Sequence, residues 1–163
     1  MREHVPGFEN AYIEQTAPAL GVRETRRIRG TYVLNQDDVL GGADFPDTVA
    51  RASCPVDIHG SDNDGQGDYR RLKQSYGIPY RSLLTEAVPN LLVTGRPVSA
   101  DRVAHSSLRR MAPGFALGEA AGIAAAMAAG TGDVHTVSVP DLQQRIRDLG
   151  GILDPEEDRI PLS

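Results

Sequence analysis

The feature that most restricts the fold is a short apolar run, residues 91–93, followed by Thr94 and Gly95 and then by a polar loop. An uninterrupted apolar run predicts a strand buried on both faces, as in a parallel sheet. The Ala- and Gly-rich segment APGFALGEAAGIAAAMAAG comes next and predicts a helix that ends at Gly130. Because one buried strand needs neighbours, we expect its sheet partners to come from another part of the protein.

The remaining segments predict short elements of both kinds, which places the chain in the α/β class. Helices are expected over residues 8–17, from Asn35 through Leu40, over residues 47–53, and from Pro140 with Leu142, Ile146 and Leu149 on its apolar face. Strands are expected over residues 28–34, CPVDIH, IPYRSLLT and residues 151–153. We therefore expect an antiparallel sheet in residues 1–88 and one final strand with its helix in residues 89–163.

Length, composition and charge indicate how many domains the chain has and which kinds of partner it can bind. The length of 163 residues favours one domain. Aromatic residues make up only 5%, without tryptophan, which indicates a chain that packs against something else. A net charge of −5 supplies no positive field for nucleic acid.

Several kinds of site are not supported by the sequence. Cys54 is the single cysteine, so neither an internal disulfide nor a CxxC pair can form, and an inert thiol is expected. The polar segment GSDNDGQGD does not fit a calcium loop, because neither Gly65 nor Gly67 has the required acid six residues later. We expect no metal site. The start MREHVPGFEN lacks an apolar signal core, and AAGIAAAMAAG is too short to span a membrane, so a cytoplasmic location is expected.

The region around Gly95 has features of a ligand site. A glycine after a buried strand lets a ligand approach the backbone closely, and ligands bind beyond the carboxyl ends of strands in α/β sheets. A helix beginning near Ala112 to Gly114 would offer unpaired N–H groups to an anion or a carbonyl. The alternative is that Gly118 and Gly122 only permit close helix packing, and spacing alone does not decide between the two.

The run from Asn90 to Ala128 resembles the C-terminal signature of a family of FAD-dependent oxidoreductases, which is distantly similar to the glutathione-reductase superfamily. Three upstream segments resemble the same family in the same order: GVRETRRIRGTYVLNQDDVL, FPDTVARASCPVDIHG and YGIPYRSLLTEAVPNLLVTGR. The resemblance implies FAD as cofactor and hydride or electron transfer on a small-molecule substrate. It also implies a substrate-domain portion in residues 1–88 and the end of a Rossmann-like FAD-binding domain in residues 89–163.

The resemblance implies three groups of cofactor-binding residues. Gly95 and Arg96 would lie near the ribityl–pyrophosphate region. A loop before the helix would bring Ser106, Ser107 and Arg109 to the cofactor side. The helix start would face the pyrimidine edge of the flavin through Ala112, Gly114, Phe115 and Ala116.

The family's GxGxxG fingerprint, which binds the ADP moiety, does not occur in this sequence. The chain therefore resembles a C-terminal fragment or a small subunit that pairs with an N-terminal FAD-binding half. Self-association is expected if that half is missing. The alternative is a non-catalytic interaction or regulatory subunit that keeps the family fold and binds no flavin.

Two residues are candidates for catalysis. Four arginines crowd VRETRRIRG, and Arg26 is a candidate for binding a substrate carboxylate, although a solvated strand face explains the cluster as well. His59 could exchange a proton beside the flavin, or it could be a structural histidine bonded to Asp57 or to the backbone. For His105 we expect a loop histidine with a backbone partner.

Overall fold

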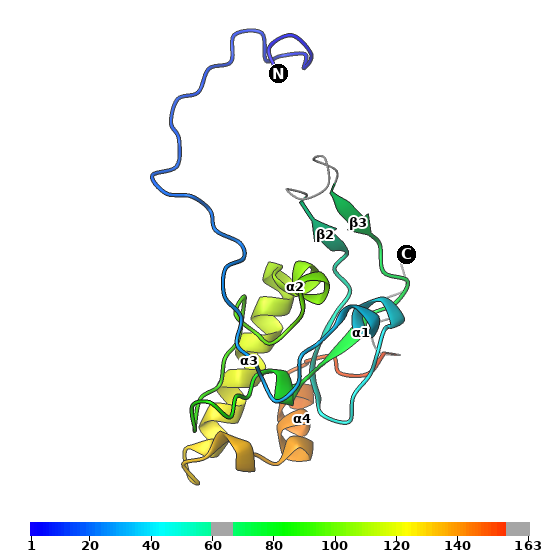
Figure 1. The fold of residues 1–163 in the computed structure, drawn as a ribbon, viewed down its shortest axis with the longest axis vertical. Coiled ribbons are helices and arrows are strands. Elements are labelled where there is room, and N and C mark those ends of the chain that lie inside the picture. Colours follow the sequence, from blue (N-terminus) through cyan, green and yellow to red (C-terminus); the bar gives the residue numbers. More distant parts are fainter. Residues whose placement is uncertain (60–66, 156–163) are drawn as a thin grey trace.

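Two small antiparallel sheets lie in the first half of the chain, and the three longest helices lie in the second half (Figure 1). The computed structural model describes residues 1–59 and 67–155. Its helices are α1 (Gln36–Gly41), α2 (Arg102–Leu108), α3 (Met111–Ala128) and α4 (Val139–Asp148), with short 3-10 turns at Tyr80–Ser82 and Val134–Thr136. Its strands are β1 (Thr48–Ala52), β2 (Val56–Ile58), β3 (Asp68–Arg70) and β4 (Tyr76–Pro79). The expected α/β class is confirmed.

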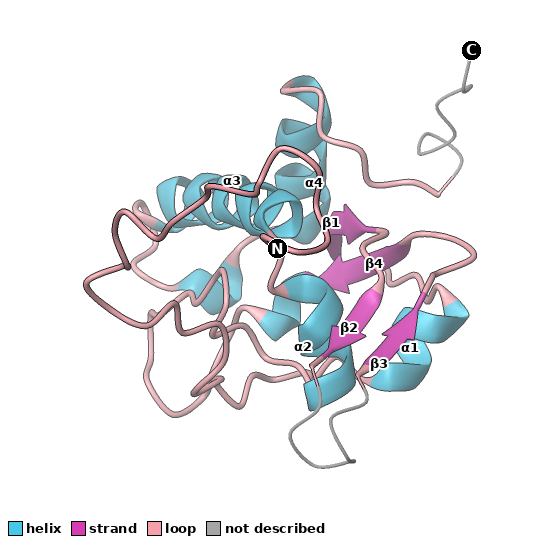
Figure 2. Ribbon diagram, turned by 90° about the horizontal axis from the view of Figure 1, so that it is seen from above, coloured by secondary structure: helices cyan, strands magenta, loops and turns pink. Residues whose placement is uncertain are grey.

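Each sheet has two strands, and the β2–β3 pair lies between β1 and β4 in the sequence. Strand β1 pairs with β4, with an irregularity between Thr48 and Ala50, and β2 pairs with β3. Helices α3 and α4 pack against β1, α1 contacts β4, and α2 contacts β2 (Figure 2). One hydrophobic core joins both halves of the chain, with Val49 and Ile78 from the sheet and Leu117 and Leu142 from the helices.

Both ends of helix α1 are determined by capping residues next to it in the sequence. The Asn35 side chain accepts hydrogen bonds from the N–H groups of Asp37 and Asp38, and the Asp38 carboxylate accepts the Asn35 N–H in return. This capping box satisfies the first donors of the helix. Gly42 ends the helix in the left-handed region at a φ of 64°. The predicted helix after Asn35 is confirmed.

Two of the expected elements near the N-terminus are wrong. Residues 8–17 form turns and irregular chain instead of a helix, because ten residues without a packed face are too few for a stable helix. Residues 28–34 are not a strand, although Leu34 makes a parallel bridge with Ala100. The N–H groups of Ile28 and Leu34 donate to residues 97 and 99, whereas those of Thr31 and Tyr32 donate to residues 84 and 81, so the segment forms no continuous ladder with either neighbour.

Further expectations in the sheet region also need correction. Strand β1 (Thr48–Ala52) stands where helical turns were expected over residues 47–53. The strand expected over IPYRSLLT ends at Pro79, and a 3-10 turn follows at Tyr80–Ser82. Residues 151–153 form no strand. The run at 91–93 is not a strand buried on both faces: Leu92 makes only an antiparallel bridge with Leu84, and Leu91 is 38% exposed. No parallel neighbour lies beside this run within the described residues, which explains the missing strand.

Helix α3 was predicted correctly, but its orientation was not. It buries Leu117, Ala120, Ala121, Ala124 and Ala128. Gly118 and Gly122 lie on the exposed side, with no heavy atom within 4 Å of an added Cβ. The alternative that these glycines permit close helix packing is therefore wrong for the described residues. By length and composition α3 could also cross a membrane, a property that core helices of soluble proteins share.

The last helix, α4, is close to its prediction. Pro140 lies in its first turn, and Leu142 and Ile146 are buried. Leu149 follows the helix and is exposed, so it does not belong to the apolar face. The acidic loop expected over residues 60–68 lies largely outside the described residues.

Candidate functional site

A pocket of about 340 Å³ lies where the N-terminal segment, the end of β2 and helix α2 meet. Its lining residues are Arg23, Glu24, Ile58, His59, Arg102 and Arg109. The volume is within the range of small-molecule sites. His59 and Arg109, which the sequence predicts as a catalytic and a cofactor-binding residue, thus lie at one pocket.

Arg109 is held in a fixed position at the end of α2. Its side chain is only 11% exposed. One terminal nitrogen donates a 2.8 Å hydrogen bond to the carbonyl oxygen of Asp57, and the other lies 3.4 Å from the Glu24 carboxylate. A guanidinium with two fixed partners and low exposure loses little freedom when it binds an anion.

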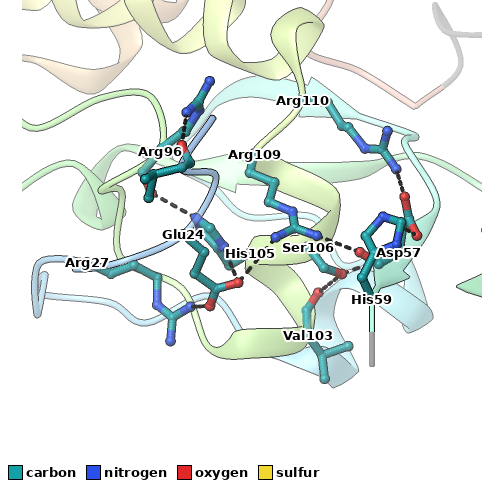
Figure 3. A network of polar contacts seen from close by, with 11 residues as sticks. Glu24, Arg27, Asp57, His59, Arg96, Val103, His105, Ser106, Arg109 and Arg110 are labelled. Atoms are coloured by element: carbon teal, nitrogen blue, oxygen red, sulfur yellow. Dashed lines mark hydrogen bonds and ion pairs between the residues drawn. The ribbon is translucent and has the colours of Figure 1, made fainter. Parts of the chain in front are cut away.

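Glu24 contacts three basic side chains at the centre of this network (Figure 3). Arg27 donates to one carboxylate oxygen, and Arg109 approaches the other. Nδ1 of His105 lies 3.5 Å from that second oxygen and makes no hydrogen bond. Contacts that join residues 24 and 109 fix the N-terminal segment to α2.

His105 connects this network to the Gly95 loop. Its ring is buried, and Nε2 lies 2.9 Å from the carbonyl oxygen of Arg96. Burial lowers the pKa of His105, although the bond to Arg96 and the charge of Glu24 act in the opposite direction. The neutral ring therefore carries its proton on Nε2, which donates to the carbonyl. The expected backbone partner is confirmed, but the residue lies on a helix and not in a loop.

His59 and Asp57 lie at the mouth of the pocket. His59 Nε2 is 3.5 Å from a carboxylate oxygen of Asp57, and Arg110 donates to the other oxygen. The side chain of His59 is largely exposed to solvent. The contact with Asp57 fits the structural alternative, and the open side of the ring leaves proton exchange as a prediction.

Ser106 and Ser107 were expected in a loop, but both lie on α2, where their hydroxyl groups are buried. Ser106 donates 2.7 Å to the carbonyl of Val103 and accepts the Asp57 N–H. Ser107 donates to the carbonyl of Cys54 and lies 2.7 Å from the Tyr76 hydroxyl. A cofactor contact through either hydroxyl would require these internal bonds to break.

Helix α2 could have been found in the sequence. The Asp101 carboxylate accepts the N–H of Ala104 at 2.7 Å, which is a typical N-cap interaction. An aspartate that precedes RVAHSSL is a start signal. The segment was instead assigned to a loop, because its residues are more polar than those of the Ala-rich helix α3 that follows.

Helix α3 begins slightly earlier than expected, and this changes which N–H groups of its first turn are unpaired. The helix begins at Met111, and the N–H of Gly114 already donates to the carbonyl of Arg110 at 3.2 Å. The N–H groups of residues 114–116 therefore belong to the helix interior, and the expectation that they point at a ligand is wrong. Met111 and Ala112 carry the N–H groups that lack an intrahelical acceptor. Phe115 is 74% exposed, and Ala116 is partly buried.

The Gly95–Arg96 turn is open. Gly95 has a φ of 76°, and no heavy atom lies within 4 Å of an added Cβ. The exposed Arg96 side chain donates to the carbonyl of Val22, which ties this turn to the N-terminal segment. Arg26 is exposed and does not line the pocket. Arg23 is the arginine of that cluster that does.

A reactive cysteine and a metal site find no support in the described part of the chain. Burial raises the pKa of the Cys54 thiol, which keeps it protonated and poorly reactive. Residues 1–59 and 67–155 contain no group of three or more side chains that could hold a metal ion.

Comparison with known proteins identifies the family. Residues 1–146 match the family described as FAD dependent oxidoreductase. No curated protein and no solved structure matches the chain. The match spans both sheets, the pocket and most of the helical half. The chain belongs to the FAD dependent oxidoreductase family.

Proposed function

We propose that the chain is the C-terminal portion or small subunit of an FAD-dependent oxidoreductase and supplies flavin and substrate contacts for hydride or electron transfer. The observation that carries this proposal is the family match over residues 1–146 together with the network that links the pocket to the Gly95 turn. That network runs from Arg109 through Glu24 and His105 to the backbone of Arg96.

The residues present fit one end of FAD. The open backbone at Gly95 accepts a close neighbour, and the α3 start offers the N–H groups of Met111 and Ala112 toward an electron-rich group. When bound, the isoalloxazine accepts or delivers the hydride or electrons. Arg96 and Ala112 would hold the cofactor. Arg109, which the resemblance assigns to the cofactor side, lines the same pocket as His59, and both would face the substrate.

The other end of FAD needs a second polypeptide or a further segment, because the GxGxxG fingerprint is not in this sequence. Exposed apolar groups support such an interface. Met111 and Phe115 lie on the outer face of α3, and Tyr12, Ile13 and Leu20 lie along the extended N-terminal segment (Figure 1). Large apolar side chains exposed one turn apart on a helix, as Met111 and Phe115 are, are typical of an interface.

Co-expression tests the proposal. The chain is produced alone and together with a polypeptide that carries the family's N-terminal FAD-binding half. We expect the pair to copurify with a flavin absorbance spectrum that bleaches on chemical reduction, while the chain alone stays colourless. A colourless copurified pair would reject the proposal.

One observation favours a second candidate, a non-catalytic subunit that keeps the family fold. The hydroxyl groups of Ser106 and Ser107 are both engaged inside the chain. Such a subunit would copurify with its partner and leave the partner's flavin content unchanged when it is removed.

A further inference from the structure

We propose that the pocket formed by the N-terminal segment, the end of β2 and α2 binds a small organic carboxylate through Arg23 and Arg109. The claim that this ligand is the substrate rests on the proposed function, whereas the binding itself does not. The site differs from the sequence-based expectation, which placed a carboxylate at Arg26.

The acidic side chains near the pocket are bound by arginines that do not line it. Glu24 is bound by Arg27, and the Asp57 carboxylate is bound by Arg110, and neither of these arginines lines the pocket. The carboxylates beside the site thus have arginine partners outside it. In the lining the guanidinium groups of Arg23 and Arg109 lie beside one carboxylate, that of Glu24, in a chain whose net charge is −5. A local positive cleft on an acidic protein attracts anions.

Arg109 and Arg23 would contribute to anion binding in different ways. Arg109 is oriented by the Asp57 carbonyl, so its planar group is in place before a ligand arrives. Arg23 is exposed and makes no hydrogen bond or ion pair with the described residues. It can close on an anion without breaking an existing bond. His59 lies beside them in the pocket lining.

The lining favours an organic carboxylate over inorganic phosphate. Ile58 contributes an apolar surface, which suits a carbon skeleton and offers nothing to an inorganic ion. The Glu24 carboxylate also lines the pocket and repels phosphate, whose charge is concentrated on one small group, more strongly than a dicarboxylate, whose two charges are separated along a carbon chain. A guanidinium matches the two oxygens of a carboxylate in a bidentate arrangement.

The test measures binding to the full chain by calorimetry and by amide chemical shifts, with malonate, succinate and inorganic phosphate as probes. We expect saturable binding of a dicarboxylate, with shifts gathered at His59, Arg102 and Arg109. Arg23→Gln should weaken the affinity about tenfold or more, because it removes a hydrogen bond to a charged group. Arg29→Gln is the matched control, since Arg29 is an exposed arginine of the same segment that lies outside the pocket.

Three results would overturn the inference: no saturable dicarboxylate binding, an equal loss of affinity in Arg29→Gln, or phosphate binding more tightly than either dicarboxylate. Denaturation curves confirm that both variants fold. The assay needs no flavin, so it separates the two claims. Carboxylate binding without flavin uptake in the co-expressed pair would reject the proposed function and leave this site standing.

Discussion

Removing the charge of Glu24 should loosen the contact between the N-terminal segment and α2. Glu24→Gln loses a partly buried hydrogen bond with Arg27, at about 1 kcal/mol, and a 3.4 Å contact with Arg109, at about 0.5 kcal/mol. It also leaves the charge of the largely buried Arg109 side chain without a carboxylate partner, which costs about 0.5 kcal/mol. We therefore expect the free energy of unfolding to fall by about 2 kcal/mol, which lowers Tm by about 4–8 °C for a chain of this size.

The same variant should become more sensitive to acid. The pKa of His105 is lowered by burial, so protonation favours the unfolded chain, and stability is lost as the pH falls below the ordinary histidine value of 6.5. Glu24 opposes this shift. Without its charge the folded-state pKa moves lower, and the stability lost between pH 7.5 and pH 5.5 grows.

Urea denaturation at both pH values measures these effects, with Glu119→Gln as control. Glu119 is an exposed acid on α3 without an ion pair in the described structure. Equal stability of Glu24→Gln and the wild type at pH 7.5, or an equal loss in the control, would refute the reasoning. An unchanged difference between the two pH values would refute the part assigned to His105.

Three other predictions concern α3 and His59. Leu117→Ala should cost about 3 kcal/mol in urea denaturation, because Leu117 is fully buried, whereas Phe115→Ala should cost less than about 0.5 kcal/mol and weaken copurification with the FAD-binding half. Met111→Pro should lower flavin retention in the assembled enzyme by removing one N–H at the first helical position, which tolerates proline, and Met111→Leu should not. His59→Ala should lower turnover while flavin content stays constant; unchanged turnover would make His59 structural.

Elements with strong local signals were predictable from the sequence. The Asn35 capping box, the Ala-rich α3 and the proline at the start of α4 each act within one or two turns. Strand β1 was mistaken for helix because TVARA is buried at four of its five positions and shows no alternation. The face of α3 was misjudged because small residues surround the whole helix, and only tertiary packing selects the buried side.

The site could be predicted only in part. His59 and Arg109 were expected to be functional, but their shared pocket depends on contacts between residues far apart in the chain. Glu24 and Arg109 are 85 positions apart, and Arg109 and Asp57 are 52 apart. A pattern of neighbouring residues in the sequence cannot predict contacts between residues so far apart. The family resemblance indicated FAD as the cofactor, whereas only the structure shows that Arg23, and not Arg26, lines the pocket.

Titration of FAD tests the central claim most directly. The purified chain, the N-terminal FAD-binding half and the mixture of both are each titrated, and bound flavin is followed by its absorbance and fluorescence. The account predicts no sub-micromolar binding by the chain alone and tight binding of one FAD per complex in the mixture. Tight stoichiometric binding by the chain alone, or a mixture that binds FAD no better than the N-terminal half does, would contradict it.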